Sequence, residues 1–351
     1  MSENNYLVIL AGGAGSRFWP ISSEELPKQF LDILGCGRTL IQLTLERFSG
    51  LIPKENVWVV TAEKYREIVM EQLPEIPSSN ILCEPCRRNT APCICYVSWK
   101  IKKLNTKANI VVSPSDHLVV DIQAFQSAID DSLSFAAETD AVVTLGLKPT
   151  RPETGYGYIK ADLTYSSSRK HNIFRVDEFK EKPTLEVAKE YIQSPNYLWN
   201  SGIFIWNVNT IINAFRVYEP EVSSIFEGLM PYYGTDKEQN KIDESYPQCK
   251  NISVDYAILE KAEEIFVFPA SFSWSDLGTW NSLREQSDMD KYGNVCIGDN
   301  IKLYDTYNTI VHTCNKKEVI VEGLDGYVVA EKEGKLLVCR LSEEQRIKLF
   351  H

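Results

Sequence analysis

The sequence predicts an α/β protein with a doubly wound mixed sheet, followed by a small all-β domain. In the first part of the chain, short continuous apolar runs alternate with longer mixed segments of helical character. Continuous hydrophobicity is typical of strands buried on both faces, as in a parallel sheet covered by helices. Beyond about residue 288, short β-rich runs are separated by Asn, Asp and Gly, which indicates a separate all-β region.

Buried strands and helices alternate in order along the first part of the chain. The strands are expected at residues 6–11, 57–62, 109–113 and 141–147. The helices are expected at residues 39–49, 63–73 and 123–138, with a further buried helix at 91–99. This order predicts β-α-β units and therefore a largely parallel sheet.

After residue 150 the expected strands become amphipathic, at residues 156–161, 174–182 and 202–207. Alternating polarity predicts an antiparallel or mixed extension of the sheet. A charged helical segment at 220–264 leads back to an aromatic-rich stretch. We expect a catalytic domain at residues 1–287 and a small β domain at residues 288–351.

The overall charge restricts the partners of the protein. The chain of 351 residues has a net charge of -11 and an isoelectric point near 5.1. Non-specific nucleic-acid binding requires a basic surface, so no nucleic-acid partner is expected. The apolar run at 6–11 is too short for a membrane segment or leader, and we expect a cytoplasmic protein with no membrane partner.

Four of the nine cysteines are clustered, at Cys83, Cys86, Cys93 and Cys95. Four thiolates could hold a zinc ion. The second pair lies in the apolar run at 91–99, where cysteine behaves as a small buried hydrophobe. The buried interpretation is preferred, and zinc is kept as the alternative.

The stretch LAGGAGSRFWPISSEELPKQF, at residues 10–30, is the most informative part of the sequence. A buried strand ends in Gly12, Gly13 and Gly15, whose backbone amides can approach phosphate oxygens closely. Arg17 and Lys28 follow and supply cations. The pattern matches neither the dinucleotide fingerprint GxGxxG nor the phosphate loop GxxxxGK[ST]. It predicts a triphosphate site of another kind.

Two acids are candidate ligands of Mg2+. Asp116 follows the strand expected at 109–113, at the carboxyl edge where open α/β sheets bind ligands. Asp276 lies among tryptophans in SFSWSDLGTW. Magnesium bound beside phosphates usually takes one or two carboxylates. A helix cap at Asp116 and a turn at Asp276 are the structural alternatives.

Two further regions offer polar groups for a base and a sugar. Glu84 and the backbone amides near Asn89 and Thr90 could read the donor and acceptor edge of guanine, although this segment also has the composition of an ordinary helix start. The segments TGYGYIK, EFKEKP and WNSGIFIW carry glycines, a carboxylate and an amide suited to sugar hydroxyls. On their own they are better explained as strands with loops.

The motifs GGxGxRxxP and PK at residues 12–28 resemble the signature of the sugar-nucleotide pyrophosphorylases. Within that family, GSRFWP with PKQF, and EPxxRNTAP at 84–92, resemble the mannose-1-phosphate guanylyltransferases. The resemblance runs in motif order from residue 7 to about 280. It implies a Rossmann-like, GT-A-like nucleotidyltransferase fold with a C-terminal domain resembling a left-handed β-helix, and a homodimer.

The resemblance also implies roles for individual residues. Arg17, Lys28 and Lys182 are the expected catalytic cations, and Asp116 and Asp276 the expected metal ligands. The expected nucleotide-binding residues are Leu10, Ala11, Gly12, Gly13, Gly15, Ser16, Arg17, Lys28, Glu84, Pro85, Asn89, Thr90, Ala91 and Asp116. The expected sugar-binding residues are Gly155, Tyr156, Glu181, Lys182, Asn200 and Gly202.

The implied reaction transfers GMP from GTP to α-D-mannose 1-phosphate with the assistance of Mg2+. The sugar phosphate attacks the α-phosphorus in line, and pyrophosphate leaves. Two alternatives remain open at this point. One is a different sugar-1-phosphate nucleotidyltransferase that uses glucose 1-phosphate with dTTP or UTP. The other is a non-catalytic regulatory paralogue that binds GDP-mannose, although retention of all the charged groups argues against it.

Overall fold

The structure is a computed structural model that describes the chain except residues 1, 14, 169–171, 315–316 and 351, with only the backbone described at 16 and 165–168. It divides into two compact units. Unit 1 contains Met1–Gly12, Glu46–Pro114 and Val119–Trp274, and unit 2 contains Gly13–Leu45, Ser115–Leu118 and Ser275–His351. Unit 2 thus contains both the glycine turn and the C-terminal tail. The boundary predicted after residue 287 divides the chain by position in the sequence, and it stays a prediction.

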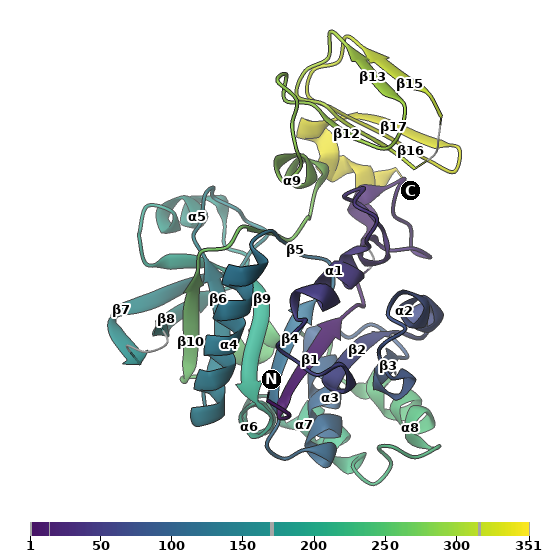
Figure 1. Cartoon of the computed structure of the whole chain (residues 1–351). Coiled ribbons are helices and arrows are strands. Elements are labelled where there is room, and N and C mark those ends of the chain that lie inside the picture. The colour runs from purple at the N-terminus through teal and green to yellow at the C-terminus, as the bar shows by residue number, and fades with distance from the viewer. Residues whose placement is uncertain (1, 14, 169–171, 315–316, 351) are drawn as a thin grey trace. The chain divides into compact units, whose positions relative to one another are not determined.

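Unit 1 is built on one nine-stranded mixed sheet (Figure 1). In spatial order its strands are β3 (Ile81–Glu84), β2 (Val57–Ala62), β1 (Asn5–Leu10), β4 (Asn109–Pro114), β9 (Tyr197–Asn207), β6 (Val142–Leu147), β10 (Ile265–Ala270), β8 (Ile173–Lys180) and β7 (Tyr158–Ser168). The first four are parallel to one another, as their continuous burial predicts. β9 runs antiparallel to both β4 and β6, so the sheet is mixed.

Helices cover both faces of this sheet. On one face α4 (Ile122–Glu138) packs against β4, β6, β9 and β10, and Asp121 caps its first turn (Figure 1). On the other face α3 (Thr90–Leu104), α6 (Val208–Tyr218) and α7 (Pro220–Gly228) share the main apolar core with the sheet. The shorter helices are α2 (Arg66–Gln72), α5 (Leu185–Tyr191) and α8 (Glu238–Ser245). The buried helix expected at 91–99 is confirmed as part of α3.

Unit 2 has a core of stacked short strands. β12 (Val295–Ile297), β14 (Ile310–Thr313) and β16 (Tyr327–Lys332) pair in parallel, as do β13 (Ile301–Tyr304) and β15 (Val319–Glu322). β17 (Lys335–Arg340) closes the stack antiparallel to β16. Parallel pairing between successive short strands is the arrangement of a β-helix, which confirms the predicted β-helix-like tail.

The remaining elements tie the glycine turn into unit 2. Phe18 in the 3-10 helix η1 (Ser16–Phe18) packs edge to face on Trp280 of α9 (Trp280–Glu285), with ring centroids 5.1 Å apart. The 3-10 helices η2 (Lys28–Phe30) and η8 (Leu341–Leu349) also belong to unit 2. α1 (Leu40–Arg47) carries the chain from unit 2 into unit 1, and β5 (Leu118–Val119) pairs with β11 (Trp274–Ser275). Across the described residues, no helix is long and apolar enough to cross a membrane.

Candidate active site

The glycine turn that follows β1 is folded closely onto Lys28. Gly15 has φ +59°, and a Cβ atom at this position would lie 2.7 Å from the backbone nitrogen of Lys28. The side-chain amide of Gln29 donates to the carbonyl oxygen of Gly13 at 3.0 Å. Glycine is therefore required at position 15 both by the left-handed backbone and by the close approach. Ser16 lies in η1, but its side chain is outside what the structure describes.

Lys28 joins three segments that are far apart in the sequence. Its ammonium lies 3.0 Å from Asp116 Oδ2 and donates to the carbonyl oxygens of Asp276 at 2.7 Å and Leu277 at 3.1 Å. The lysine side chain is only 10% exposed. All of these residues belong to unit 2. The predicted catalytic lysine and both predicted metal ligands are thus brought together within one compact unit.

A pocket of about 300 Å³ lies at this convergence. Its lining residues are Gly15, Arg17, Phe18, Lys28, Asp116, His117, Asp276, Leu277 and Gly278. Arg17 is exposed at its rim, whereas Lys28 is buried. The pocket therefore combines two cations, two carboxylates and a glycine turn, a set of groups suited to polyphosphate and a divalent cation.

The electrostatics of Asp116 keep its carboxylate ionised. Burial raises its pKa, but the neighbouring Lys28 ammonium and then His117 outweigh burial, so the pKa lies below its usual range. Asp276 Oδ1 accepts a hydrogen bond from the Gly278 backbone amide at 2.9 Å, and a Cβ on Gly278 would lie 2.6 Å from Asp276 Oδ2. The local turn therefore fixes the orientation of the second carboxylate.

Asp116 and Asp276 both line this pocket, and carboxylates are the protein ligands that suit a divalent cation whose other ligands come from phosphate and water. In the part of the chain that the structure describes, no cluster of three or more His, Cys, Asp or Glu side chains is arranged to hold a metal ion. A magnesium ion beside phosphates does not need such a cluster, because one or two carboxylates are its usual protein ligands.

The clustered cysteines have the environment of core residues. Burial raises the pKa of the Cys83 thiol to about 11, and it raises the pKa values of Cys93 and Cys95 well above the usual range. Cys93 and Cys95 lie in α3 and contribute to the main core of unit 1.

Glu84 ends β3 in unit 1, beside the start of the glycine turn. Its Oε1 accepts a hydrogen bond from the Tyr246 hydroxyl, and a Cβ on Gly12 would lie 3.2 Å from its Oε2. Leu10 is the last residue of β1, and the backbone amide of Ala11 bonds to Val60. Glu84 thus lies at the carboxyl edge of the parallel strands, where ligands bind in such sheets. The following Pro85 is exposed.

Two of the backbone amides proposed to read a base, those of Thr90 and Ala91, already have hydrogen-bond partners. Asn89 caps α3, and its Oδ1 accepts the Thr90 amide at 3.1 Å. The Ala91 amide donates to the Ile252 carbonyl oxygen at 3.1 Å. Thr90 Oγ1 accepts the Val254 amide at 2.9 Å. The structure therefore gives this segment a helix-capping role, and base contacts from Asn89, Thr90 and Ala91 stay a prediction.

The predicted sugar-binding residues form a second cluster in unit 1. A Cβ on Gly157 would lie 2.5 Å from Glu181 Oε2 and 3.3 Å from the Cβ of Asn200, so both side chains approach the backbone of Gly157 closely. The Lys182 ammonium lies 2.8 Å from Glu181 Oε1. Burial lowers the pKa of Lys182, but the hydrogen bond and charge of Glu181 outweigh it and raise the pKa.

Three other predicted sugar residues lie around this cluster. The Gly202 amide donates to Asn200 Oδ1 at 3.2 Å. The Tyr156 ring contacts Trp199 and Trp274 edge to face, with centroids 5.2 and 5.3 Å away. Gly155 is exposed, and its amide donates to Glu153 at 3.1 Å.

Sequence reasoning missed Asp255, which lies beside the predicted sugar-binding residue Asn200. It begins the π-helical turn Asp255–Leu259, and its Oδ1 accepts a hydrogen bond from Asn200 Nδ2 at 3.1 Å. Burial, reinforced by the charge of Glu181, raises its pKa to about 6. One feature of the sequence could have indicated Asp255. It is an acid inside the apolar run VDYAIL, and an ordinary surface helix does not explain an acid in such a run.

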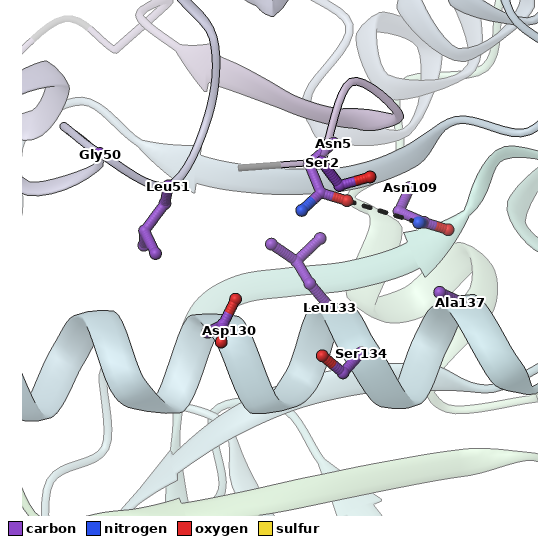
Figure 2. Close-up of a pocket in the computed structure, with 9 residues that line it drawn as sticks. All are labelled: Ser2, Asn5, Gly50, Leu51, Asn109, Asp130, Leu133, Ser134 and Ala137. Carbon is purple, nitrogen blue, oxygen red and sulfur yellow. Dashed lines mark hydrogen bonds between the residues drawn. The ribbon is translucent and has the colours of Figure 1, made fainter.

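Figure 2 shows a smaller cavity of about 200 Å³ in unit 1. It lies beside the first residues of β1 and β4, where Asn109 Nδ2 donates to Asn5 Oδ1 at 3.4 Å. Its other lining residues include Asp130, Leu133 and Ser134 of α4. Ligands in open α/β sheets bind at the carboxyl ends of the strands. This cavity lies at the amino ends and carries no predicted site residue.

Comparison with known proteins shows which family and which solved structure the chain resembles. The sequence model of the family described as nucleotidyl transferase matches residues 6–292. The chain is 35% identical over 353 residues to mannose-1-phosphate guanylyltransferase of Escherichia coli, covering 99% of this chain and 75% of that protein. It is 36% identical over 346 residues to the alginate biosynthesis protein AlgA of Pseudomonas syringae pv. tomato, covering 97% and 70%.

A solved structure from Thermus thermophilus, described as mannose-1-phosphate geranyltransferase, is 32% identical to this chain. It superposes with a TM-score of 0.87 and covers 99% of this chain and 98% of its own. The agreement over the whole length confirms the predicted fold class.

Proposed function

The chain belongs to the nucleotidyl transferase family, and from this premise we propose that it transfers GMP from GTP to α-D-mannose 1-phosphate. The products are GDP-mannose and pyrophosphate. The names of similar proteins support this choice of substrates. The observation that carries the proposal is the convergence of Lys28, Asp116 and Asp276 on one pocket beside a glycine turn.

In the proposed reaction a phosphate oxygen of the sugar phosphate attacks the α-phosphorus of GTP in line. A new P–O bond forms, the bond to the β-phosphate bridging oxygen breaks, and pyrophosphate leaves with the electron pair. No protein nucleophile is needed. Because both reactants are polyanions, the protein works by positioning and charge neutralisation. Arg17 and Lys28 act on the triphosphate, and Lys182 acts on the incoming phosphate.

Mg2+ is the cofactor that we propose, held by Asp116 and Asp276. When bound, it neutralises phosphate charge and fixes the triphosphate for in-line attack. Asp116 already pairs with Lys28. A metal ion held by Asp116 would replace Lys28 as its partner, and the Lys28 ammonium would then pair with the phosphates. The ion pair therefore holds both side chains in place before the nucleotide arrives.

The sugar is assigned to the cluster in unit 1. Glu181, Asn200 and Asp255 offer oxygen and amide groups to the sugar hydroxyls, and Gly157 leaves room for their close approach. Lys182 is held beside Glu181, next to this cluster.

Glu84 is the residue that we assign to guanine. A carboxylate accepts hydrogen bonds with two oxygens, and guanine presents a pair of donors, N1–H and the 2-amino group. Uracil and thymine present a single donor, N3–H, between two carbonyl oxygens. A carboxylate therefore favours guanine over the pyrimidines of the alternative reactions.

A pyrophosphate-release assay across substrates tests the proposal. Mannose 1-phosphate and glucose 1-phosphate are each combined with GTP, dTTP or UTP in the presence of Mg2+. The highest kcat/KM is expected for GTP with mannose 1-phosphate. A higher value for glucose 1-phosphate with dTTP or UTP would support the alternative enzyme. Binding of GDP-mannose with no turnover of any pair would support the regulatory paralogue.

We also propose that the protein acts as a homodimer in the cytoplasm, without nucleic-acid or membrane partners. The net charge of -11 supports the absence of a nucleic-acid partner. Light scattering during size-exclusion chromatography tests the oligomeric state, with a mass of twice 40.0 kDa expected.

A further inference from the structure

Tyr246 is a buried residue whose hydroxyl reaches the proposed base-binding acid. It begins the 3-10 helix Tyr246–Gln248, and it is completely inaccessible to solvent. Its ring packs edge to face on Phe226 of α7, with centroids 5.8 Å apart. Its hydroxyl donates a hydrogen bond to Glu84 Oε1, although the two residues are 162 positions apart. The core therefore fixes the phenol ring, and the phenol fixes one oxygen of the carboxylate.

The second oxygen of Glu84 points to the beginning of the glycine turn. A Cβ on Gly12 would lie 3.2 Å from Glu84 Oε2. Gly12 follows directly on β1, and Glu84 is the last residue of β3. Glu84 is partly exposed, whereas Tyr246 is not. A ligand at this edge can therefore reach the carboxylate without contacting Tyr246.

We propose that Tyr246 is a positioning residue for nucleotide selection, which holds the Glu84 carboxylate in the orientation that reads the N1–H and 2-amino edge of guanine. This inference rests on the proposed function, in which Glu84 recognises the base. Tyr246 acts only through Glu84. Two parallel hydrogen bonds require a fixed carboxylate plane, and an acid free to rotate would lose rotamer entropy on binding.

The charge of Glu84 depends on the same hydrogen bond. Burial raises the pKa of Glu84 to about 7, while the hydrogen bond from Tyr246 and the charge of Arg87 oppose this rise. Cys93 of α3 also faces the carboxyl group, and burial keeps its thiol neutral by raising its pKa. Removal of the Tyr246 hydroxyl should therefore raise the pKa of Glu84 and leave less carboxylate at neutral pH.

This gives the inference a pH signature. If the ionised carboxylate reads guanine, KM for GTP falls as pH rises through the pKa of Glu84. We call this fall in KM the pH limb. In Tyr246→Phe the same fall should occur at higher pH. A loss of packing alone would change stability but would leave the position of this pH limb unchanged.

The experiment measures kcat and KM of the full chain for GTP and for inosine triphosphate, which lacks the 2-amino group, between pH 6 and 9. Mannose 1-phosphate and Mg2+ are kept saturating. For Tyr246→Phe at pH 7 we expect KM for GTP to rise roughly tenfold, the effect of one hydrogen bond to a charged group. The kcat should change little, and the preference for GTP over inosine triphosphate should fall.

Tyr233→Phe is the matched control. Tyr233 is also a buried tyrosine of this core, and its hydroxyl donates to the Phe226 carbonyl oxygen at 2.7 Å. This variant removes the same hydroxyl group without changing a partner of Glu84. The pH limb and the preference for GTP should both stay as in the unmodified protein.

Glu84→Gln separates the possible outcomes and covers the case in which Tyr246→Phe folds poorly. It should abolish the pH limb, and adding Tyr246→Phe to it should change KM for GTP no further. The inference is overturned if Tyr246→Phe keeps the pH limb and nucleotide preference while Glu84→Gln alters both. That outcome leaves the proposed function intact. A chain that prefers UTP or dTTP instead overturns the proposed function itself.

Discussion

The Lys28 ammonium lies 3.0 Å from Asp116 Oδ2, in a side chain that is only 10% exposed. The same ammonium donates to the backbone oxygens of Asp276 and Leu277. A buried charge is stable only where it is paired and hydrogen-bonded. This lysine has an acid and two carbonyl oxygens as partners, all beside the proposed triphosphate pocket, so its position is fixed before any substrate binds.

Lys28→Ala should reduce kcat about 10²–10³-fold, because it removes a cation aligned with the transferring phosphates. Steady-state pyrophosphate release measures the loss. The matched control is Lys54→Ala, whose ammonium lies 3.8 Å from Glu75 on the surface and is 68% exposed. Such exposed pairs contribute little, so this control should keep its activity. Near-normal turnover in Lys28→Ala would remove the role assigned to Lys28.

Asp116→Asn should raise the Mg2+ concentration needed for half-maximal rate by roughly tenfold or more, since one of two carboxylate ligands is lost. Titration of initial rate against Mg2+ at fixed GTP measures this. Asp121→Asn is the control, because asparagine can still cap α4 as Asp121 does. An unchanged Mg2+ dependence in Asp116→Asn would show that this acid does not hold the metal.

The Lys28 and Asp116 pair also predicts how stability depends on pH. The folded-state pKa of Asp116 is below its usual value, chiefly because Lys28 outweighs burial. Such a group contributes stability above its unfolded pKa of about 3.9, and the contribution is lost as pH falls through the folded pKa. Thermal melts of Asp116→Asn and the unmodified protein should therefore converge below about pH 4. A constant difference in Tm across that range would contradict this.

Gly15→Ala should destabilise the fold more than Gly37→Ala does. Both glycines have positive φ, +59° and +80°, so each alanine adds roughly 1–2 kcal/mol of backbone strain. At Gly37 the new Cβ meets nothing within 4 Å, whereas at Gly15 it would lie 2.7 Å from the Lys28 backbone nitrogen. Calorimetric Tm values measure the difference, and only Gly15→Ala should also lower kcat. Equal Tm values for the two variants would show that the contact of the new Cβ with the Lys28 backbone does not destabilise the fold.

Asp255→Asn should stabilise the protein above pH 6 while weakening sugar binding. The folded pKa of Asp255 is raised to about 6, mainly by burial. Ionisation of this acid therefore destabilises the fold as pH rises from about 4 to 6. Asparagine removes that effect, and we expect KM for mannose 1-phosphate to rise about tenfold through loss of an acceptor for a sugar hydroxyl. Asp177→Asn, on an exposed acid, is the control. A normal KM in Asp255→Asn would place the acid outside the sugar site.

The sequence was most informative where chemistry and local pattern coincide. The strand β1 and the glycine turn could be predicted because a continuous apolar run predicts a buried strand and glycines predict a turn, and both signals lie within a few residues. Asp116 was predicted from its place after a buried strand. The position of β9 was beyond such reasoning, because it lies between β4 and β6 rather than at the edge of the sheet. Strand pairing between distant segments is set by the whole core and not by the strand itself.

The same limit explains the residues that were missed. Tyr246 and Asp255 are hydrogen-bonded to partners 162 and 55 positions away, Glu84 and Asn200. Nothing within a short window distinguishes a core tyrosine from one that positions an acid. The composition of unit 2 was also not predicted, since it joins the glycine turn to the tail through contacts such as Phe18 on Trp280.

A crystal structure with Mg2+, mannose 1-phosphate and a GTP analogue that resists attack at the α-phosphorus tests the central claim most directly. The triphosphate should lie in the pocket formed by Gly15, Arg17 and Lys28, with one metal ion contacting both Asp116 and Asp276. Nucleotide bound elsewhere, or a metal ion that contacts neither acid, would contradict it.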